Sequence, residues 1–93
     1  MRYRYGINID LDARYPTVRE FAEQMRHALY ANRMDREHWS HESQMALFTE
    51  ILREVYKLSV TITNGSTYDV CHKCIGIANI AMMISDIHGG MED

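Results

Sequence analysis

The sequence predicts an all-α fold in which one small helical domain forms a bundle that a second copy of the chain completes. Apolar residues recur at spacings of three and four along three long segments, which is typical of amphipathic helices. The chain has only 93 residues, and 46% of them are apolar. A domain of this size buries only about 60–65% of its unfolded surface. We therefore expect residues 1–93 to form a single domain that associates with itself.

Composition argues against several classes of partner. The net charge of −3 gives no basic field for nucleic acid. No apolar run approaches the roughly 20 residues of a membrane span, and the N-terminus has no signal-peptide core. Two cysteines are too few for a disulfide scaffold, which points to a reducing compartment. We expect a cytoplasmic protein with no membrane or nucleic-acid partner.

The N-terminal segment alternates apolar and polar residues. One parity carries Tyr3, Tyr5, Ile7, Ile9 and Leu11. Alternation of this kind indicates an extended chain, and no second strand lies nearby in the sequence. We predict a short extended arm over residues 1–16, with an unordered terminus as the alternative.

A first helix is expected from Pro16 to about Asn32. Thr17 and Glu20 have the spacing of a capping box, with Thr17 as N-cap. The polar stretch "MDREHWSHES" then forms a connection, which contains Trp39, the only tryptophan.

A second helix is expected from Ser40 or Ser43 to about Ser59. Its apolar face is broad. At spacings of three and four lie Met45, Phe48, Leu52 and Val55, and this stripe is widened by Leu47, Ile51 and Leu58. The β-branched run "VTITNGST" ends in an Asn-Gly turn signal. We predict that the helix frays there into a loop, with a short hairpin as the alternative.

A third helix is expected from about Tyr68 to Ile87, ended by the Gly89-Gly90 pair. Its apolar seam is typical of close helix packing: Val70, Cys74, Ile77, Ala81 and Ile84. Paired second and third helices from two chains would complete a bundle, so we predict a homodimer or a higher homo-oligomer.

The cysteine pair raises the question of a metal site or a nucleophile. Cys71 and Cys74 could hold half of a zinc site, with nearby histidines as further ligands, but no second paired cluster exists. Cys71 and His72 are adjacent on a helix and point apart, so a catalytic pair is not favoured. We predict neither a metal nor a cofactor.

Three segments in order resemble a known family. The third predicted helix contains "IANIAMMISD", the first contains "REFAEQMRHALYANR" and precedes Trp39, and the second contains "LFTEILREVYKL". Together they resemble the MazG-like, all-α nucleoside triphosphate pyrophosphohydrolases over roughly residues 21–86. The resemblance implies a MazG-like helical bundle.

The family's carboxylates are largely missing from this chain. In that family an E-E-x-x-E turn and an E-x-x-D turn hold Mg²⁺, which grips the triphosphate while water attacks. By resemblance the first motif falls on Arg53, Glu54 and Lys57, and the second on Lys73 and Gly76. Only Glu54 keeps a carboxylate, so this departure from the pattern puts catalysis in doubt.

The replaced positions suggest a cation-lined site that grips phosphate directly. We expect a ligand cleft lined by Arg53, Lys57, Lys73, Trp39, Asn79, Tyr30, Arg33 and Glu54. Trp39 would stack on a base, or alternatively cover the core. The charged residues would otherwise be solvated surface groups. A further alternative is a shifted metal register, in which Glu50 and Glu54 are joined by Asp69 or Asp86 of the third helix.

These features predict a non-catalytic nucleotide-binding protein. A phage-type sponge that sequesters a nucleotide immune signal would fit, acting in the host cytoplasm if phage-encoded. The alternatives are an active Mg²⁺-dependent pyrophosphohydrolase and a helical protein-interaction module.

Overall fold

The computed structural model describes residues 15–90, and within this range the chain is entirely helical. Four helices follow one another: α2 (Pro16–Ala31), α3 (Arg36–Trp39), α4 (Gln44–Asn64) and α5 (Thr67–Ile87). The described range contains no strand. The all-α prediction is confirmed. The predicted extended arm lies almost wholly outside the described residues, and its last position, Pro16, is already helical.

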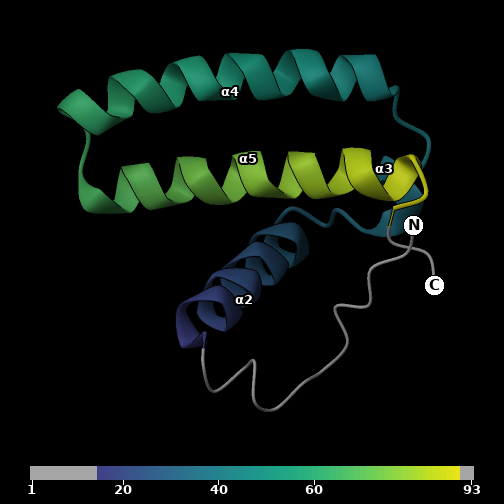
Figure 1. The fold of residues 1–93 in the computed structure, drawn as a ribbon, viewed down its shortest axis with the longest axis horizontal. Helices are drawn as coiled ribbons and strands as arrows, with labels where there is room; N and C mark the ends of the chain where they lie inside the picture. The colour runs from purple at the N-terminus through teal and green to yellow at the C-terminus, as the bar shows by residue number, and fades with distance from the viewer. Residues whose placement is uncertain (1–14, 91–93) are drawn as a thin grey trace.

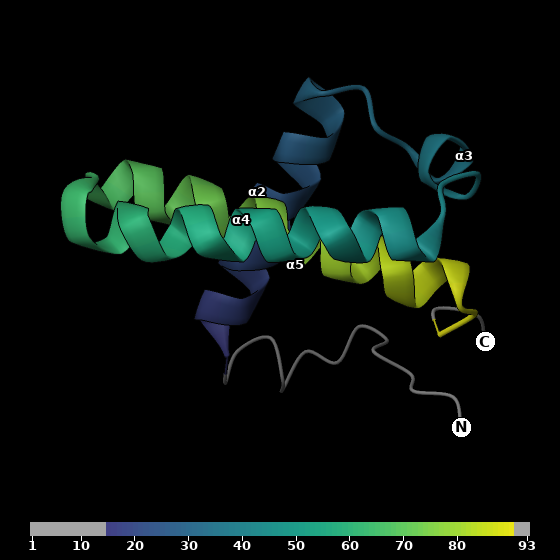
Figure 2. The same cartoon turned by 90° about the horizontal axis from the view of Figure 1, so that it is seen from above.

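Helix α5 is the centre of the arrangement (Figure 1). It packs against α4, α2 and α3, most extensively against α4. Helices α4 and α5 lie side by side and antiparallel, and α2 crosses α5 on the side away from α4 (Figure 2). A helix with neighbours on several sides needs apolar residues on several faces. This explains why the sequence of α5 is apolar nearly all round.

The start of one helix, α2, differs from the prediction in its N-cap residue. Helix α2 begins with Pro16 at its first position and Tyr15 as N-cap, without a side-chain cap. The capping box predicted at Thr17 is therefore wrong, because proline fixes the first helical position ahead of it. A capping box does occur at α5. There the Ser66 Oγ accepts from the Asp69 N–H at 3.1 Å, and the Ser66 N–H donates to Asp69 Oδ2 at 3.1 Å.

Helix α4 continues five residues beyond the predicted end at Ser59. The loop and hairpin predictions for this stretch are wrong, since α4 runs unbroken to Asn64. The Thr61 Oγ1 donates to the Lys57 carbonyl at 2.7 Å, so its hydroxyl is satisfied within the helix. The Asn-Gly turn signal marks the true end. A Cβ on Gly65 would lie 2.9 Å from the Thr61 carbonyl oxygen, so glycine alone fits there.

The end of α5 confirms the predicted glycine stop. Gly89 has φ +93°, and its N–H donates to the Asp86 carbonyl at 3.0 Å. The Gly90 N–H donates to the Ser85 carbonyl at 2.8 Å. These two bonds form a Schellman motif, which satisfies carbonyls that the helix leaves without partners.

The core of the described chain is small. Its buried apolar side chains are Trp39, Leu47, Ile80 and Met83. The most buried positions of α5 are Asn79, Ile80, Met83 and Asp86 rather than the predicted seam, of which Ala81 is exposed. No side chain in the described range is completely buried. Much apolar surface therefore remains in contact with water.

One helix passes a simple test for a membrane span. By length and mean hydropathy alone, α5 would suffice to cross a membrane, contrary to the expectation from the sequence. A mostly buried core helix passes the same test, and in the described residues 22% of the apolar window of α5 is buried.

Candidate functional site

The eight predicted site residues do not form one cleft, because α5 separates them. Helices α2 and α4 lie on different sides of α5, so residues that face α4 cannot meet residues that face α2. Glu54, Lys57 and Lys73 gather between α4 and α5. Tyr30, Arg33 and Trp39 line a pocket near the end of α2. Asn79 faces α2, and Arg53 is exposed on α4.

The cluster between α4 and α5 is centred on a carboxylate. Glu54 Oε2 lies 3.3 Å from Lys57 Nζ, and Glu54 Oε1 lies 3.4 Å from Lys73 Nζ. Partial burial by itself raises the pKa of Glu54. The hydrogen bonds and charges of Lys57 and Lys73 outweigh it and hold that pKa below its ordinary value. The two lysines therefore favour the ionised form of Glu54.

These contacts weaken the idea of an open cationic cage. Both lysines are engaged by Glu54, and one negative charge offsets part of their charge. The described residues contain no group of three or more metal-ligating side chains. The carboxylates of Asp86 and Asp69, which a shifted metal register would use, accept hydrogen bonds at opposite ends of α5, from Trp39 and from the Ser66 N–H.

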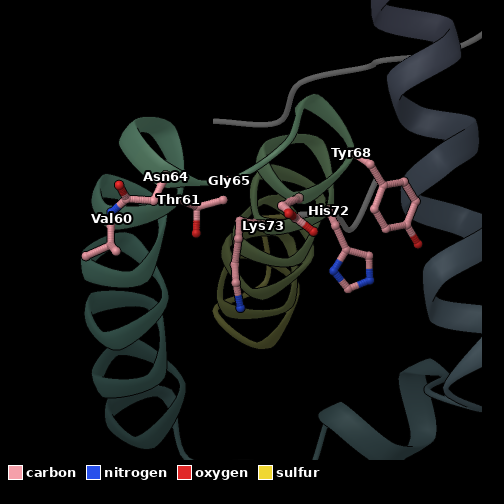
Figure 3. A pocket seen from close by; sticks show the side chains of 8 residues that line it. Val60, Thr61, Asn64, Gly65, Tyr68, His72 and Lys73 are labelled. Atoms are coloured by element: carbon pink, nitrogen blue, oxygen red, sulfur yellow. The ribbon is translucent and has the colours of Figure 1, made fainter.

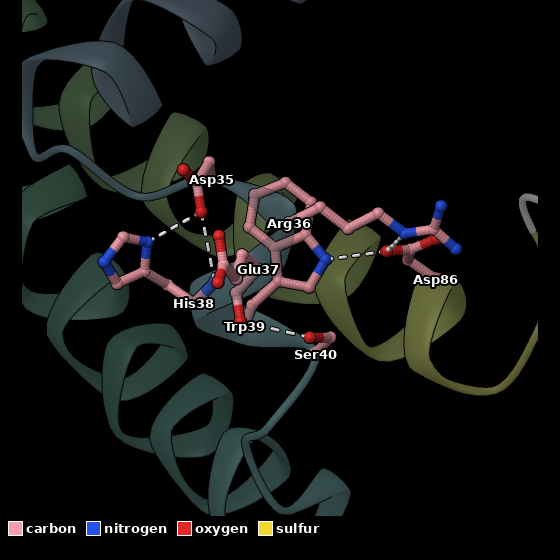
Figure 4. Close-up of polar contacts among 7 residues, drawn as sticks. All are labelled: Asp35, Arg36, Glu37, His38, Trp39, Ser40 and Asp86. Carbon is pink, nitrogen blue, oxygen red and sulfur yellow. Dashed lines mark hydrogen bonds and ion pairs between the residues drawn. The ribbon is translucent and has the colours of Figure 1, made fainter.

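Trp39 lies in the core. It is 8% exposed, and its Nε1–H donates to Asp86 Oδ2 at 2.7 Å (Figure 4). The Arg36 Nε–H donates to the same oxygen at 3.0 Å. The buried carboxylate thus receives two donors from α3. Of the two roles considered for Trp39, its burial agrees with core packing and leaves little ring surface for stacking.

The short helix α3 holds these donors in place. The Asp35 carboxylate caps it by accepting from the His38 N–H at 3.1 Å, and Asp35 Oδ1 also lies 2.7 Å from His38 Nδ1. These bonds lower the pKa of Asp35, the side-chain contact to His38 most of all. The sequence pointed only to a polar connection here.

Asn79 joins α5 to α2. It is 5% exposed, and its Nδ2 donates to the Met25 carbonyl at 3.2 Å. Its Oδ1 is buried and has no hydrogen-bond partner within residues 15–90. The side chain therefore holds two helices together on the face of α5 that is turned towards α2, away from Glu54.

A pocket of about 530 Å³ lies between the end of α2 and α3, and we call it the corner pocket. Three predicted residues line it: Tyr30, Arg33 and Trp39. Sequence reasoning missed its other basic lining residues, which are Arg26, Arg36 and His38. Basic and aromatic residues are interspersed between Arg26 and Trp39, on both sides of the α2–α3 connection, and this pattern could have indicated the pocket.

The cations of the corner pocket differ in their partners. Arg26 pairs with Glu23 at 2.6 Å, and Arg36 pairs with the buried Asp86. Arg33 forms no ion pair with any described residue, and its backbone has φ 54° at the end of α2. Tyr30 beside it is 86% exposed. An exposed aromatic ring and a guanidinium that has no ion-pair partner among residues 15–90 therefore line the same pocket.

A second pocket, of about 420 Å³, lies at the turn between α4 and α5 (Figure 3). Lys73 lines it together with Asn64, and the rings of Tyr68 and His72 stack there at a centroid distance of 5.9 Å. One aspartate lines each pocket, Asp69 here and Asp35 in the corner pocket. The turn pocket is less suited to an anion, because its Lys73 is held by Glu54 whereas arginines line the corner pocket.

Comparisons of the chain with models of protein families, with curated proteins and with solved structures find no match. The family resemblance of the sequence therefore stays a prediction.

Proposed function

We propose that this chain is a non-catalytic protein that binds a nucleotide-type ligand in the corner pocket and works as a homo-oligomer. The observation that carries the proposal is the pairing of Arg33, which has no anionic partner among the described residues, with the exposed ring of Tyr30 in one pocket.

The pocket offers both kinds of contact that a nucleotide needs. The Arg33 guanidinium suits phosphate oxygens, which it can bind with two parallel hydrogen bonds. Tyr30 offers a face for base stacking, which contributes about 1–3 kcal/mol in other proteins. The volume of about 530 Å³ lies in the range of small-molecule sites. The pocket surface is also mostly apolar, as in such sites generally, and its charged lining residues are basic except for Asp35.

The absence of catalysis is part of the proposal. Mg²⁺ requires several oxygen ligands, and by resemblance only Glu54 remains from the family's metal motifs. In this fold both oxygens of Glu54 are occupied by lysines. A binder without turnover would act by sequestration, as a phage-type sponge for a nucleotide signal in the host cytoplasm would.

Calorimetric titration with ATP and with cyclic di-AMP tests the binding site. Arg33→Glu should weaken binding by at least tenfold, because a charge-assisted contact contributes about 1.5–3 kcal/mol and each 1.4 kcal/mol is about tenfold. Tyr30→Ala should weaken nucleotide binding but not any binding of inorganic triphosphate, which has no base.

Arg19→Glu is the matched control, since Arg19 is exposed on α2 and does not line the pocket. Equal affinity for wild type and Arg33→Glu would refute the site. Release of pyrophosphate from ATP in the presence of Mg²⁺ would instead favour the pyrophosphohydrolase alternative.

The oligomer is proposed from the outer face of α4. Large apolar side chains lie along this face, 46–68% exposed, at the spacings of a packing seam: Met45, Phe48, Leu52, Val55 and Ile62. The charged residues of α4 are confined to positions 50, 53, 54 and 57, off this stripe. An uncharged stripe along a six-turn helix suits a second copy of itself, related by a two-fold axis.

Light scattering after gel filtration tests the oligomer. Leu52→Lys should dissociate it, because burying this lysine in the seam would be unfavourable. Glu50→Lys places the same residue on the other side of α4 and should not. An oligomer that survives Leu52→Lys would show that α4 does not form the interface. Capture of a different protein by this face would favour the interaction-module alternative.

A further inference from the structure

The cysteine pair of α5 has no role in the functions considered above. Cys71 is exposed and Cys74 is partly buried, and both are free. Cys71 also lines a groove of about 720 Å³ between α2 and α5, which is open to small molecules. Cysteine is usually among the most buried residue types, even when it forms no disulfide. Packing alone therefore does not explain a cysteine at this exposed position.

We propose that Cys71 and Cys74 form a redox-active dithiol, which a small-molecule disulfide such as oxidised glutathione converts into a disulfide within one chain. The spacing is that of a C-x-x-C motif. In the reducing cytoplasm proposed for this chain, disulfides are usually transient and serve catalysis or redox sensing. The dithiol does not depend on nucleotide binding, because neither cysteine lines the corner pocket.

The helical spacing brings the two cysteines within reach of one another. At the rise and radius of an α-helix, Cα atoms three residues apart are separated by about 5 Å, and disulfides join Cα atoms about 4.4–6.8 Å apart. The Cβ atoms of such a pair are about 5–6 Å apart, whereas a disulfide requires about 3.5–4.5 Å. The helix must therefore tighten locally by about 1–2 Å, which strains the disulfide and makes it easy to reduce.

The surroundings of the pair allow this local change. The pair begins just after the first turn of α5, which starts at Thr67, so few helical hydrogen bonds precede it. Gly76 follows the pair, and glycine favours a helix less than any residue except proline. Neither cysteine belongs to the buried core. A change confined to this end of α5 is therefore compatible with the rest of the fold.

The exchange proceeds in two balanced steps. The Cys71 thiolate attacks one sulfur of oxidised glutathione, the glutathione S–S bond breaks, and one glutathione leaves and takes up a proton. The Cys74 sulfur then loses its proton and attacks Cys71 Sγ, which displaces the second glutathione as its thiol. The protein thus loses two hydrogen atoms, and one oxidised glutathione becomes two reduced ones. Cys71 reacts first because it is the more exposed cysteine.

Mass spectrometry of the intact protein after mixing with oxidised glutathione tests the dithiol. Wild type should pass through a glutathione adduct to a form that is two hydrogen atoms lighter. Cys74→Ser should stop at the adduct, because it lacks the second thiol. Cys71→Ser should form its adduct at least about tenfold more slowly, since Cys74 is partly buried. Excess reduced glutathione should return the oxidised wild type to the dithiol.

A matched control moves the second thiol out of reach. When Cys74→Ser is combined with Gly76→Cys, the two cysteines are separated by about 8.6 Å between Cα atoms on a helix, too far for a disulfide. A Cβ at Gly76 meets no neighbouring atom within 4 Å, so this variant should fold and stop at the adduct. Closure of its disulfide as fast as in wild type would overturn the role of the helical spacing. A wild type that does not react, that stops at the adduct, that resists reduced glutathione once oxidised, or that forms disulfides between chains instead would overturn the proposal.

Discussion

The contact between Trp39 and Asp86 is expected to be the main support of the small core. Trp39→Phe keeps an aromatic ring but removes the indole N–H that donates to Asp86 Oδ2 at 2.7 Å. Asp86 is 7% exposed, so water does not readily replace the lost donor. Only the Arg36 bond, from a side chain that is itself largely exposed, would remain on that oxygen among the contacts described above.

Two contributions add up to the expected loss in the free energy of unfolding of Trp39→Phe. A hydrogen bond to a charged group contributes about 1.5–3 kcal/mol. The smaller ring leaves space that costs about 1 kcal/mol more in a packed core. Together these predict a loss of about 3 kcal/mol in the free energy of unfolding. For a domain of this size, that corresponds to a fall in Tm of about 12–24 °C.

Thermal and urea unfolding followed by circular dichroism measure this loss, at one protein concentration because the chain is proposed to associate. Tyr30→Phe is the matched control. It removes a hydroxyl from a side chain that is 86% exposed and should change stability by less than about 0.5 kcal/mol. A loss of less than about 0.5 kcal/mol for Trp39→Phe would refute the structural role of the indole and reopen stacking on a base.

Three further predictions concern the ion cluster, the end of α5 and its middle. Glu54→Gln should cost roughly 0.5–1 kcal/mol at pH 7, since its partners are partly exposed. Folding lowers the pKa of Glu54, so its contribution to stability is present above the ordinary pKa of 4.5 and is lost as the pH falls through the lowered pKa. The free energy of unfolding of Glu54→Gln should therefore decline less in acid than that of the wild type. Gly89→Ala should cost about 1–2 kcal/mol of unfolding free energy through its positive φ alone, because a Cβ there meets no atom within 4 Å. Gly76→Ala, which also has open space around its Cβ, should raise Tm, and a fall would show that a partner chain approaches α5 at this point.

Much of the fold could be predicted from local patterns. Helical spacing located three of the four helices in the described residues, and the Gly89-Gly90 pair marked the end of α5. The end of α4 was missed because its β-branched residues favour strands intrinsically, whereas threonine hydroxyls and contact with α5 allow the helix to continue. The short helix α3 was missed because one helical turn carries too little periodicity to detect.

The candidate site was predicted less well than the fold. A sequence motif can group residues that lie on different faces of one helix. Lys73 and Asn79 both belong to α5, but Lys73 contacts α4 and Asn79 contacts α2. The role of Trp39 depended on Asp86, a partner 47 positions away, which no local pattern reveals. Tyr30 and Arg33 are close in sequence and do line one pocket, although with neighbours that were not foreseen.

The central claim is that the corner pocket holds a phosphorylated nucleotide without converting it. Its most direct test is mass spectrometry of the small molecules that heat releases from the purified protein, with the Arg33→Glu variant measured in parallel. We predict that wild type releases an intact nucleotide and that the variant, folded and oligomeric, releases none. Release of the same nucleotide in equal amounts from both proteins, or of no nucleotide from wild type, would contradict the account.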